Sequence, residues 1–303
     1  MFGSSFLLRK KCYRMEREIM SKKSKGILFI ILSAFCFALM NLFVRLSGDL
    51  PSMQKSFFRN AVALVFAVIV LLRSEEKFQF NRKNLPLLLT RSAFGTIGIL
   101  CNYYAVDHLV LSDASMLNKL SPFFAIIISY LYLKEKVTPF QVSAVVVAFI
   151  GALCIIKPGF SSLTTGPALL GALGGLGAGA AYTMVRRLSM NGERGPFIVF
   201  FFSAFSSLFC LPYLLFAYHP MTLTQLILLL LAGLSAAGGQ FAITAAYANA
   251  PAREISVFDY SQIVFAALLG FFFLNQTPDL LSVIGYIIIC GTSVAMFFYN
   301  QKH

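Results

Sequence analysis

The sequence predicts an all-α integral membrane protein with ten transmembrane helices, arranged as two inverted five-helix repeats. The chain is 58% hydrophobic and only 12% charged, whereas an ordinary soluble domain is roughly 45–50% apolar and about 25% charged. Apolar runs also recur along its whole length. A bilayer suits this composition, because lipid solvates the outer faces of helices that satisfy their own backbone hydrogen bonds.

Ten apolar segments are long enough to cross a bilayer, which takes about 20 residues of helix. Turn-forming and helix-breaking residues separate them, among them Thr138-Pro139 and Thr277-Pro278. The predicted spans are 26–46, 56–73, 85–106, 114–133, 138–156, 167–185, 196–217, 224–248, 255–274 and 281–299.

The positions of the basic residues predict the orientation. Most of the 25 Lys and Arg fall in the N-terminal segment and in alternate connectors. Because cytoplasmic loops carry an excess of Lys and Arg, both termini are predicted to be cytoplasmic. The short loops and abundant phenylalanine favour the cytoplasmic (inner) membrane of a bacterium. The net charge of +13 is then a topology signal, and nucleic acid is not expected as a partner.

The chain divides into four predicted segments. Residues 1–19 are basic and irregular, and Met20 begins a more typical start, so we expect either a disordered cytoplasmic tail or a native start at Met20. The segments are a basic tail at 1–25, a first repeat at 26–157, a second repeat at 158–299 and a cytoplasmic C-terminal tail at 300–303.

An internal repeat is visible at an offset of 141 residues, where 104–135 aligns with 245–276 and Asp113 aligns with Glu254. Five spans separate the equivalent positions. An odd number of spans reverses the direction of the second copy, so the halves are predicted to be antiparallel. In inverted-repeat transporters the substrate site lies at the interface of the repeats, near the bilayer midplane.

Several short motifs carry a resemblance to a known family. They are Arg91-Ser-Ala-Phe-Gly95, Tyr103-Tyr104-Ala105, Leu111-Ser-Asp113-Ala114-Ser115, Leu120-Ser121-Pro122-Phe123 and Leu133-Lys134-Glu135-Lys136. Through them the chain resembles the EamA-type drug/metabolite transporter superfamily over most of 26–299. The second half departs from the pattern, since Gln262-Ile263 stands where the first half has Ser121-Pro122.

This resemblance implies two inverted EamA repeats of five helices each. It implies a central cavity lined mainly by the first four helices of each half, with the fifth and tenth spans peripheral. It also implies export or exchange of a small metabolite.

Two ionisable residues lie well inside predicted spans, Lys119 in the fourth and Asp259 in the ninth. A charge at this depth is costly, by about 2.5–3.5 kcal/mol on insertion scales, and usually faces a cavity or a partner. The repeat places these opposite charges on related helices. They are expected to form either a substrate clamp, with Asp259 as a candidate carrier of a coupled proton, or a static pair that maintains helix packing.

Two arginines lie nearer the predicted span ends. For Arg59, near the outer end of the second span, two interpretations stand: snorkelling to the headgroups or anion binding at the outer mouth. Arg91 begins the third span at the cytoplasmic side and is expected to be an interface anchor.

Uncharged polar side chains complete the predicted site. Tyrosine offers both a stacking face and a hydroxyl, and amides buried among helices need hydrogen-bond partners. The residues predicted to contact substrate are Lys119, Asp259, Arg59, Asn41, Asn118, Tyr104, Tyr182 and Tyr260.

A glycine-rich run in the sixth span resembles a nucleotide loop, but it lacks the Lys-Ser/Thr of a P-loop and no strand precedes it. Gly171, Gly175 and Gly179 recur every four residues, a spacing that predicts a flat helix face for close packing. Pro122 in the fourth span is expected to bend that helix and to free a backbone carbonyl.

These features favour a secondary transporter that works by alternating access. The substrate class is a small polar metabolite, such as an amino acid or a related compound. An intramembrane enzyme and a channel-like protein are the alternatives, but the sequence shows no catalytic motif and no continuous polar stripe. No metal or cofactor is expected, because the six cysteines are scattered and no histidine accompanies them at metal spacing.

Overall fold

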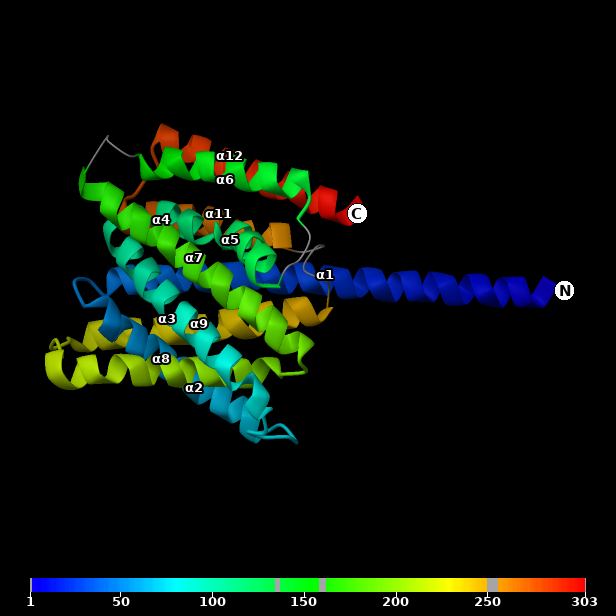
Figure 1. Ribbon diagram of the computed structural model, residues 1–303, viewed down its shortest axis with the longest axis horizontal. Coiled ribbons are helices and arrows are strands. Elements are labelled where there is room, and N and C mark those ends of the chain that lie inside the picture. Colours follow the sequence, from blue (N-terminus) through cyan, green and yellow to red (C-terminus); the bar gives the residue numbers. More distant parts are fainter. Residues whose placement is uncertain (1, 134–136, 158–161, 250–255, 303) are drawn as a thin grey trace.

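The computed structural model describes residues 2–133, 137–157, 162–249 and 256–302, and it is a bundle of helices (Figure 1). Within these residues, nine helices are long and apolar enough to cross a membrane, and the tenth crossing, Phe258–Leu274, is a shorter apolar helix. The prediction of an all-helical membrane fold with ten helices is therefore confirmed. The predicted matches at Glu254 and at Lys134-Glu135-Lys136 lie outside the described residues.

The first half supplies five crossings, the fourth of which is interrupted. In chain order its elements are α1 (Phe2–Leu46), α2 (Ser52–Leu72), the short 3₁₀ turn η1 (Arg82–Asn84), α3 (Leu85–His108), α4 (Leu111–Asn118), α5 (Ser121–Ile128), the π-helical turn η2 (Ser129–Leu133) and α6 (Pro139–Ile156).

The second half repeats this order, again with an interruption in its fourth crossing. Its elements are α7 (Ser162–Met190), α8 (Gly195–Ala217), α9 (Leu223–Asn249), the 3₁₀ turn η3 (Ser256–Tyr260), α11 (Ser261–Leu274) and α12 (Leu280–Lys302).

The helix pairing has the symmetry of an inverted repeat. α1, the first helix of the first half, packs along α9, the third helix of the second half, and α7 packs along α3 in the same way. The equivalent helices α2 and α8 pair with each other, as do α6 and α12. α1 and α7 run in opposite directions, and the two chain ends point to the same side (Figure 1).

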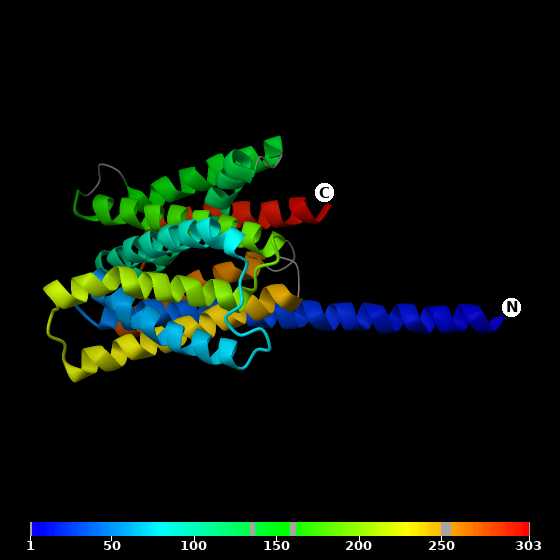
Figure 2. The ribbon, with the colours of Figure 1, turned by 60° about the horizontal axis from the view of Figure 1, so that its bottom comes forward.

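The first helix continues well beyond the bundle in both ribbon views (Figure 2). Its membrane-spanning part is Ser24–Leu46, and residues 2–23 extend it. Extending an existing helix adds one hydrogen bond per residue without the cost of a new nucleus. The division that assigns 1–25 to a cytoplasmic tail stays a prediction.

Each fourth crossing has a break, meaning a departure from regular α-helix, and the two breaks contact each other. α4 ends at Asn118 and α5 begins at Ser121, with Pro122 in the first turn, where its missing N–H costs nothing. On the other side, η3 ends at Tyr260 and α11 begins at Ser261. The Tyr260 hydroxyl donates to the Lys119 carbonyl at 3.1 Å, so one break satisfies a carbonyl that the other leaves outside the helix.

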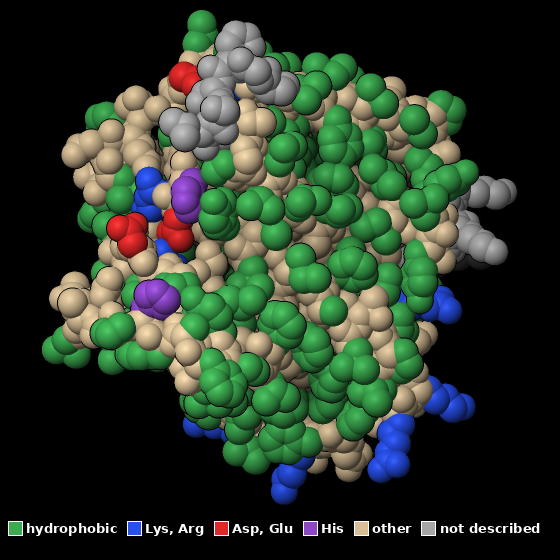
Figure 3. All heavy atoms as spheres, turned by 60° about the vertical axis from the view of Figure 1, so that its left-hand side comes forward, with side chains coloured by type: hydrophobic (Ala, Val, Ile, Leu, Met, Phe, Trp, Pro, Cys, Tyr) green, Lys and Arg blue, Asp and Glu red, His purple; other side chains and the backbone are tan. Residues whose placement is uncertain are grey.

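The outer surface matches a membrane environment. Figure 3 shows hydrophobic side chains across the flank of the bundle, with charged side chains gathered toward its ends. Large apolar residues with more than half of their surface exposed include Leu208, Leu215, Phe272 and Leu280. In water such a surface would be an aggregation liability, whereas lipid solvates it.

Candidate functional site

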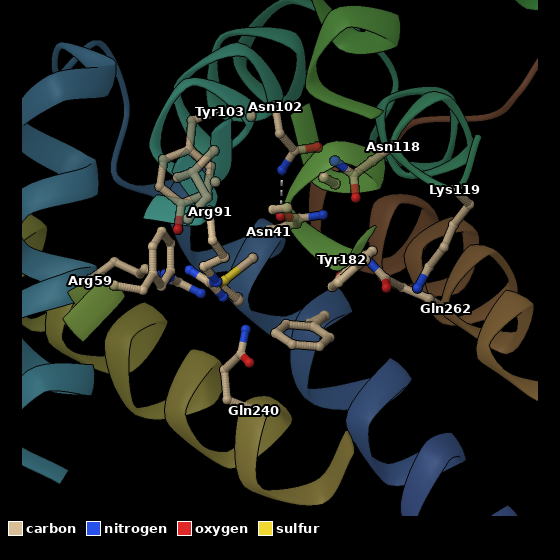
Figure 4. A pocket seen from close by; sticks show the side chains of 18 residues that line it. Asn41, Arg59, Arg91, Asn102, Tyr103, Asn118, Lys119, Tyr182, Gln240 and Gln262 are labelled. Atoms are coloured by element: carbon tan, nitrogen blue, oxygen red, sulfur yellow. Dashed lines mark hydrogen bonds between the residues drawn. The ribbon is translucent and has the colours of Figure 1, made fainter. Parts of the chain in front are cut away.

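A cavity of about 100 Å³ lies between the two halves of the bundle (Figure 4). It is lined by helices from both halves, and neither α6 nor α12 contributes a residue. This agrees with the peripheral place that the family resemblance implies for those two helices. The polar side chains of the wall are Asn41, Arg59, Arg91, Asn102, Tyr103, Asn118, Lys119, Tyr182, Gln240 and Gln262.

Two arginines from the first half form one end of the cavity. Arg59 on α2 is 3% exposed and Arg91 on α3 is 7% exposed. The Arg91 guanidinium carbon lies 3.8 Å from the centre of the Phe202 ring, and that of Arg59 lies 5.9 Å from it. A guanidinium over an aromatic face is stabilised by the ring quadrupole, so Phe202 on α8 supports both cations.

Neither arginine has an acidic partner among the described residues. Arg59 Nη1 donates to the Asn60 amide oxygen at 2.5 Å, but Arg59 Nε and the Nε and Nη1 atoms of Arg91 have no hydrogen-bond partner there. Lys55, one turn before Arg59 on the same helix, pairs with Asp107 at 2.6 Å. Lys55 is therefore neutralised by a carboxylate, whereas Arg59 and Arg91 are cations that no acidic side chain among the described residues neutralises.

The structure brings Lys119 and Asp259 together. Their Nζ and Oδ2 atoms are 2.5 Å apart, which joins the break in the fourth crossing to the break in the ninth. Asp259 Oδ1 has no hydrogen-bond partner among the described residues. The pair carries no net charge, so the excess positive charge of the wall comes from the arginines.

Amides lie between these two charged ends. Asn102 donates to the Asn41 side-chain oxygen at 3.4 Å, and Asn41 donates to Ser115 at 3.4 Å. These contacts are long, and both Asn102 Oδ1 and the Tyr103 hydroxyl have no partner within the described part of the chain. Weakly engaged buried polar atoms can bind a substrate without first breaking strong bonds.

The predicted tyrosines fall in three different places. Tyr182 lines the cavity. Tyr260 lies behind the ion pair and contacts it through the Lys119 carbonyl. Tyr104 does not line the cavity, and its ring stacks on that of His108 with the ring centres 4.1 Å apart. Its neighbour Tyr103 is fully buried and reaches the wall instead.

The predictions for the arginines also need correction. Arg59 is buried, so it does not snorkel to the surface, and it lies in the wall of the central cavity instead of at an outer mouth. Arg91 is no interface anchor, because Phe202 packs against it. The sequence feature that could have indicated this burial of Arg91 is the glycine one turn after it. A Cβ at Gly95 would lie 2.9 Å from the Phe202 ring, so glycine is what admits that ring.

The glycine face of α7 packs against the broken fourth crossing. A Cβ at Gly175 would lie 2.6 Å from the Leu117 carbonyl oxygen, and one at Gly179 would lie 2.6 Å from the Ser121 carbonyl oxygen. At Gly171 the nearest atom is the Ala105 Cβ at 3.1 Å. The glycines therefore let the α7 backbone approach α4 and α5 on either side of the break.

Metal chemistry has no support in the described part of the chain. No group of three or more His, Cys, Asp or Glu side chains there could hold a metal ion. Free thiols on five different helices are Cys36, Cys101, Cys154, Cys210 and Cys290.

A multi-pass bundle with a polar cavity between two related halves has the architecture of a membrane transporter. Comparison with known protein families gives the particular class. The EamA-like transporter family matches residues 24–157 and 166–298. The chain belongs to this family of secondary transporters, each half is one EamA domain, and the family is one of transporters and not of enzymes.

Individual relatives agree with this assignment. The pseudopaline exporter CntI of Pseudomonas aeruginosa is 33% identical over 273 residues, which cover 89% of this chain and 95% of the relative. The riboflavin transporter of Rhizobium johnstonii is 27% identical over 262 residues, which cover 85% and 86%. A solved crystal structure has a TM-score of 0.66 at 14% identity, over 92% of this chain and 98% of that one, a likeness that supports the fold alone.

Proposed function

We propose that the protein exports or exchanges a small polar organic metabolite, such as an amino acid or a related compound, across the cytoplasmic membrane of a bacterium. Both termini are then cytoplasmic, as the distribution of Lys and Arg predicts. The main support is the polar cavity that both halves line. The similarity to an exporter over most of the chain favours outward transport.

The size of the cavity favours alternating access over a channel. At about 100 Å³ it is far smaller than typical ligand pockets, which occupy roughly 300–1,000 Å³. A metabolite needs the walls to move apart before it can enter. The close backbone contacts at Gly175 and Gly179 provide a smooth surface along which α7 can shift against α4 and α5.

Hydrogen bonds between the halves join them at both ends of the bundle. At one end Gln54 exchanges two hydrogen bonds with the backbone of His219, at 2.9 and 3.0 Å. At the other, Asn84 donates to Glu193 and accepts from Asn191, both at 3.0 Å. A cycle that opens one end at a time would break one set while the other holds.

Lys119 and Asp259 supply a candidate coupling element. A proton on Asp259 would remove its charge and weaken the contact with Lys119, which joins the two helix breaks. A gradient of protons could then bias the cycle. The same pair could instead serve exchange without any ion, with the substrate competing for Lys119.

Flux into proteoliposomes tests the proposal. The purified chain is reconstituted, and uptake of a labelled metabolite mixture is followed with and without a pH gradient. A carrier gives saturable flux that is stimulated by substrate on the opposite side. Flux that never saturates and shows no trans-stimulation would favour the channel-like alternative. Flux that is insensitive to the pH gradient would contradict proton coupling through Asp259.

A further inference from the structure

We propose that the cavity selects an organic anion, and that Arg59 and Arg91 together bind a carboxylate or phosphate group of it. This inference rests on the proposed transport function and names the substrate class of the same site. It starts from two guanidinium groups that are almost wholly buried, at 3% and 7% exposure, and that have no acidic partner in the described part of the chain.

Burial makes these charges expensive. An ionised group in a low-dielectric interior costs several kcal/mol unless an opposite charge compensates it. Elsewhere in the bundle the fold supplies that compensation, because Lys55 has Asp107 and Lys119 has Asp259. At the arginines it supplies a neutral amide, Asn60, and an aromatic ring, Phe202. The compensating anion is therefore expected from the transported molecule.

The geometry suits one shared anionic group. Arg59 and Arg91 come from different helices and point into the same part of the cavity (Figure 4). Guanidinium groups present N–H donors in a planar fork that matches a carboxylate or phosphate. Phe202 holds the flat face of Arg91 at 3.8 Å and leaves the guanidinium edge for the ligand. One anion between the two cations would also relieve their mutual repulsion.

The rest of the wall limits what else the substrate carries. Lys119 and Gln262 lie at the far side of the cavity from the arginines, with Asn41 and Asn102 between them (Figure 4). This far end has no net charge, because Asp259 neutralises Lys119. The wall as a whole therefore favours net negative molecules over neutral and cationic ones of the same size.

A transport competition tests the charge selectivity. Proteoliposomes with the wild-type chain are given a yeast-extract metabolite mixture supplemented with equal amounts of aspartate, asparagine, putrescine and glycerol 3-phosphate, and the transported compounds are identified by mass spectrometry. We expect the transported set to consist of compounds with net negative charge, such as aspartate and glycerol 3-phosphate, and the carboxylates and phosphate esters within it show which anion is preferred. A transported set dominated by amines or by neutral compounds overturns the inference.

Matched variants test the two residues. Arg59→Gln and Arg91→Gln are each expected to lower transport of the anions at least tenfold, and the corresponding Lys variants less, because lysine keeps the charge and loses the fork. Arg73→Gln, at the exposed end of α2, is the control and should transport normally. Unchanged anion transport in both Gln variants overturns the inference. Should the Gln variants fail to fold, as judged by gel filtration, a partial fall in anion transport in the Lys variants supports the inference, and wild-type transport in both Lys variants overturns it.

A binding measurement separates this inference from the proposed function. The thermal unfolding temperature of the purified chain is measured with the anionic, neutral and cationic fractions of the same extract. If no compound is transported, the transport proposal fails, and stabilisation by the anionic fraction in the wild type but not in Arg91→Gln still supports the anion site. If the anionic fraction stabilises neither protein, the anion site is rejected as well.

Discussion

The two halves of this protein share a scaffold but not a chemistry. Each has five crossings with a break in the fourth, and their helices pack in exchanged pairs. The cations of the cavity wall, however, all come from the first half: Arg59, Arg91 and Lys119. The second half supplies Tyr182, Phe202, Gln240 and Gln262, together with the counter-ion Asp259. Symmetry has been kept in the backbone, which must move, and lost in the side chains, which must recognise an asymmetric molecule.

The largest expected effect comes from separating Lys119 from Asp259, the charge pair that joins the halves at the cavity. Lys119→Met and Asp259→Asn should each lower transport more than tenfold and destabilise the protein, because removal of one partner of a buried pair leaves an uncompensated charge, at a typical cost of about 3–5 kcal/mol. Flux and thermal unfolding of each variant are the measurements.

The double variant separates a functional pair from a static one. Lys119→Met combined with Asp259→Asn removes both charges, so stability should largely return while transport stays low. Normal transport in both single variants would instead mean that the pair has no role beyond packing.

The glycine face of α7 gives the next largest effect. Gly175→Ala places a Cβ 2.6 Å from the Leu117 carbonyl oxygen, and such overpacking costs about 1–3 kcal/mol. The matched control is Gly291→Ala on α12, where nothing lies within 4 Å of the added Cβ. Thermal unfolding should show a loss for the first and no loss for the second. Equal unfolding temperatures would mean that the halves do not depend on this contact.

Removing single tyrosine hydroxyl groups tests the contact between the halves on a smaller scale. Tyr260→Phe removes the hydrogen bond to the Lys119 carbonyl, a typical loss of about 0.5–1.5 kcal/mol, and should lower transport several-fold by loosening both helix breaks. Tyr104→Phe lies outside the cavity and should change neither stability nor flux. A stronger transport defect in Tyr104→Phe than in Tyr260→Phe would contradict the placement of both.

The smallest effect is a pH dependence at the ends of α6 and α12, where Lys157 and Asp279 form an ion pair. Partial burial raises the pKa of Asp279, but the Lys157 hydrogen bond and charge and the Ser282 backbone outweigh it, and the pKa lies below its usual value. The contribution to stability is therefore complete above the ordinary Asp pKa of about 3.9 and is lost as pH falls through the lower folded value. Thermal unfolding between pH 7 and pH 3 should fall less in Asp279→Asn than in the wild type, and parallel curves would contradict this.

Much of the fold could be predicted because the bilayer leaves few alternatives. Apolar runs, connectors and basic residues suffice to count the crossings, and the five-span offset is enough to invert the halves. The pairing of Lys119 with Asp259 followed from the same offset. The predictions that were wrong concern the face of a helix on which a side chain lies. Tyr103 and Tyr104 are adjacent, yet one is buried and the other stacks on His108, and an error of one residue in helix phase exchanges them.

The predictions for Arg59 and Arg91 were wrong for a different reason. Sequence rules place a basic residue near a span end at the headgroups, since that is where its charge is least costly. Arg91 lies in the wall of a cavity because Gly95 admits the Phe202 ring from the other half. That contact depends on how α3 and α8 meet, which neither helix specifies alone. Polar residues recruited by tertiary packing are therefore the ones that single-helix reasoning misses.

The buried arginines also have a consequence for the membrane itself. A cell must not dissipate its membrane potential through a membrane transporter. Positive charge in a narrow passage repels protons and metal cations, and Arg59 and Arg91 stand in the wall of a cavity of only about 100 Å³. We therefore expect the same two residues that attract the substrate to hold the resting leak of cations low, so that their loss would cost the cell energy as well as transport.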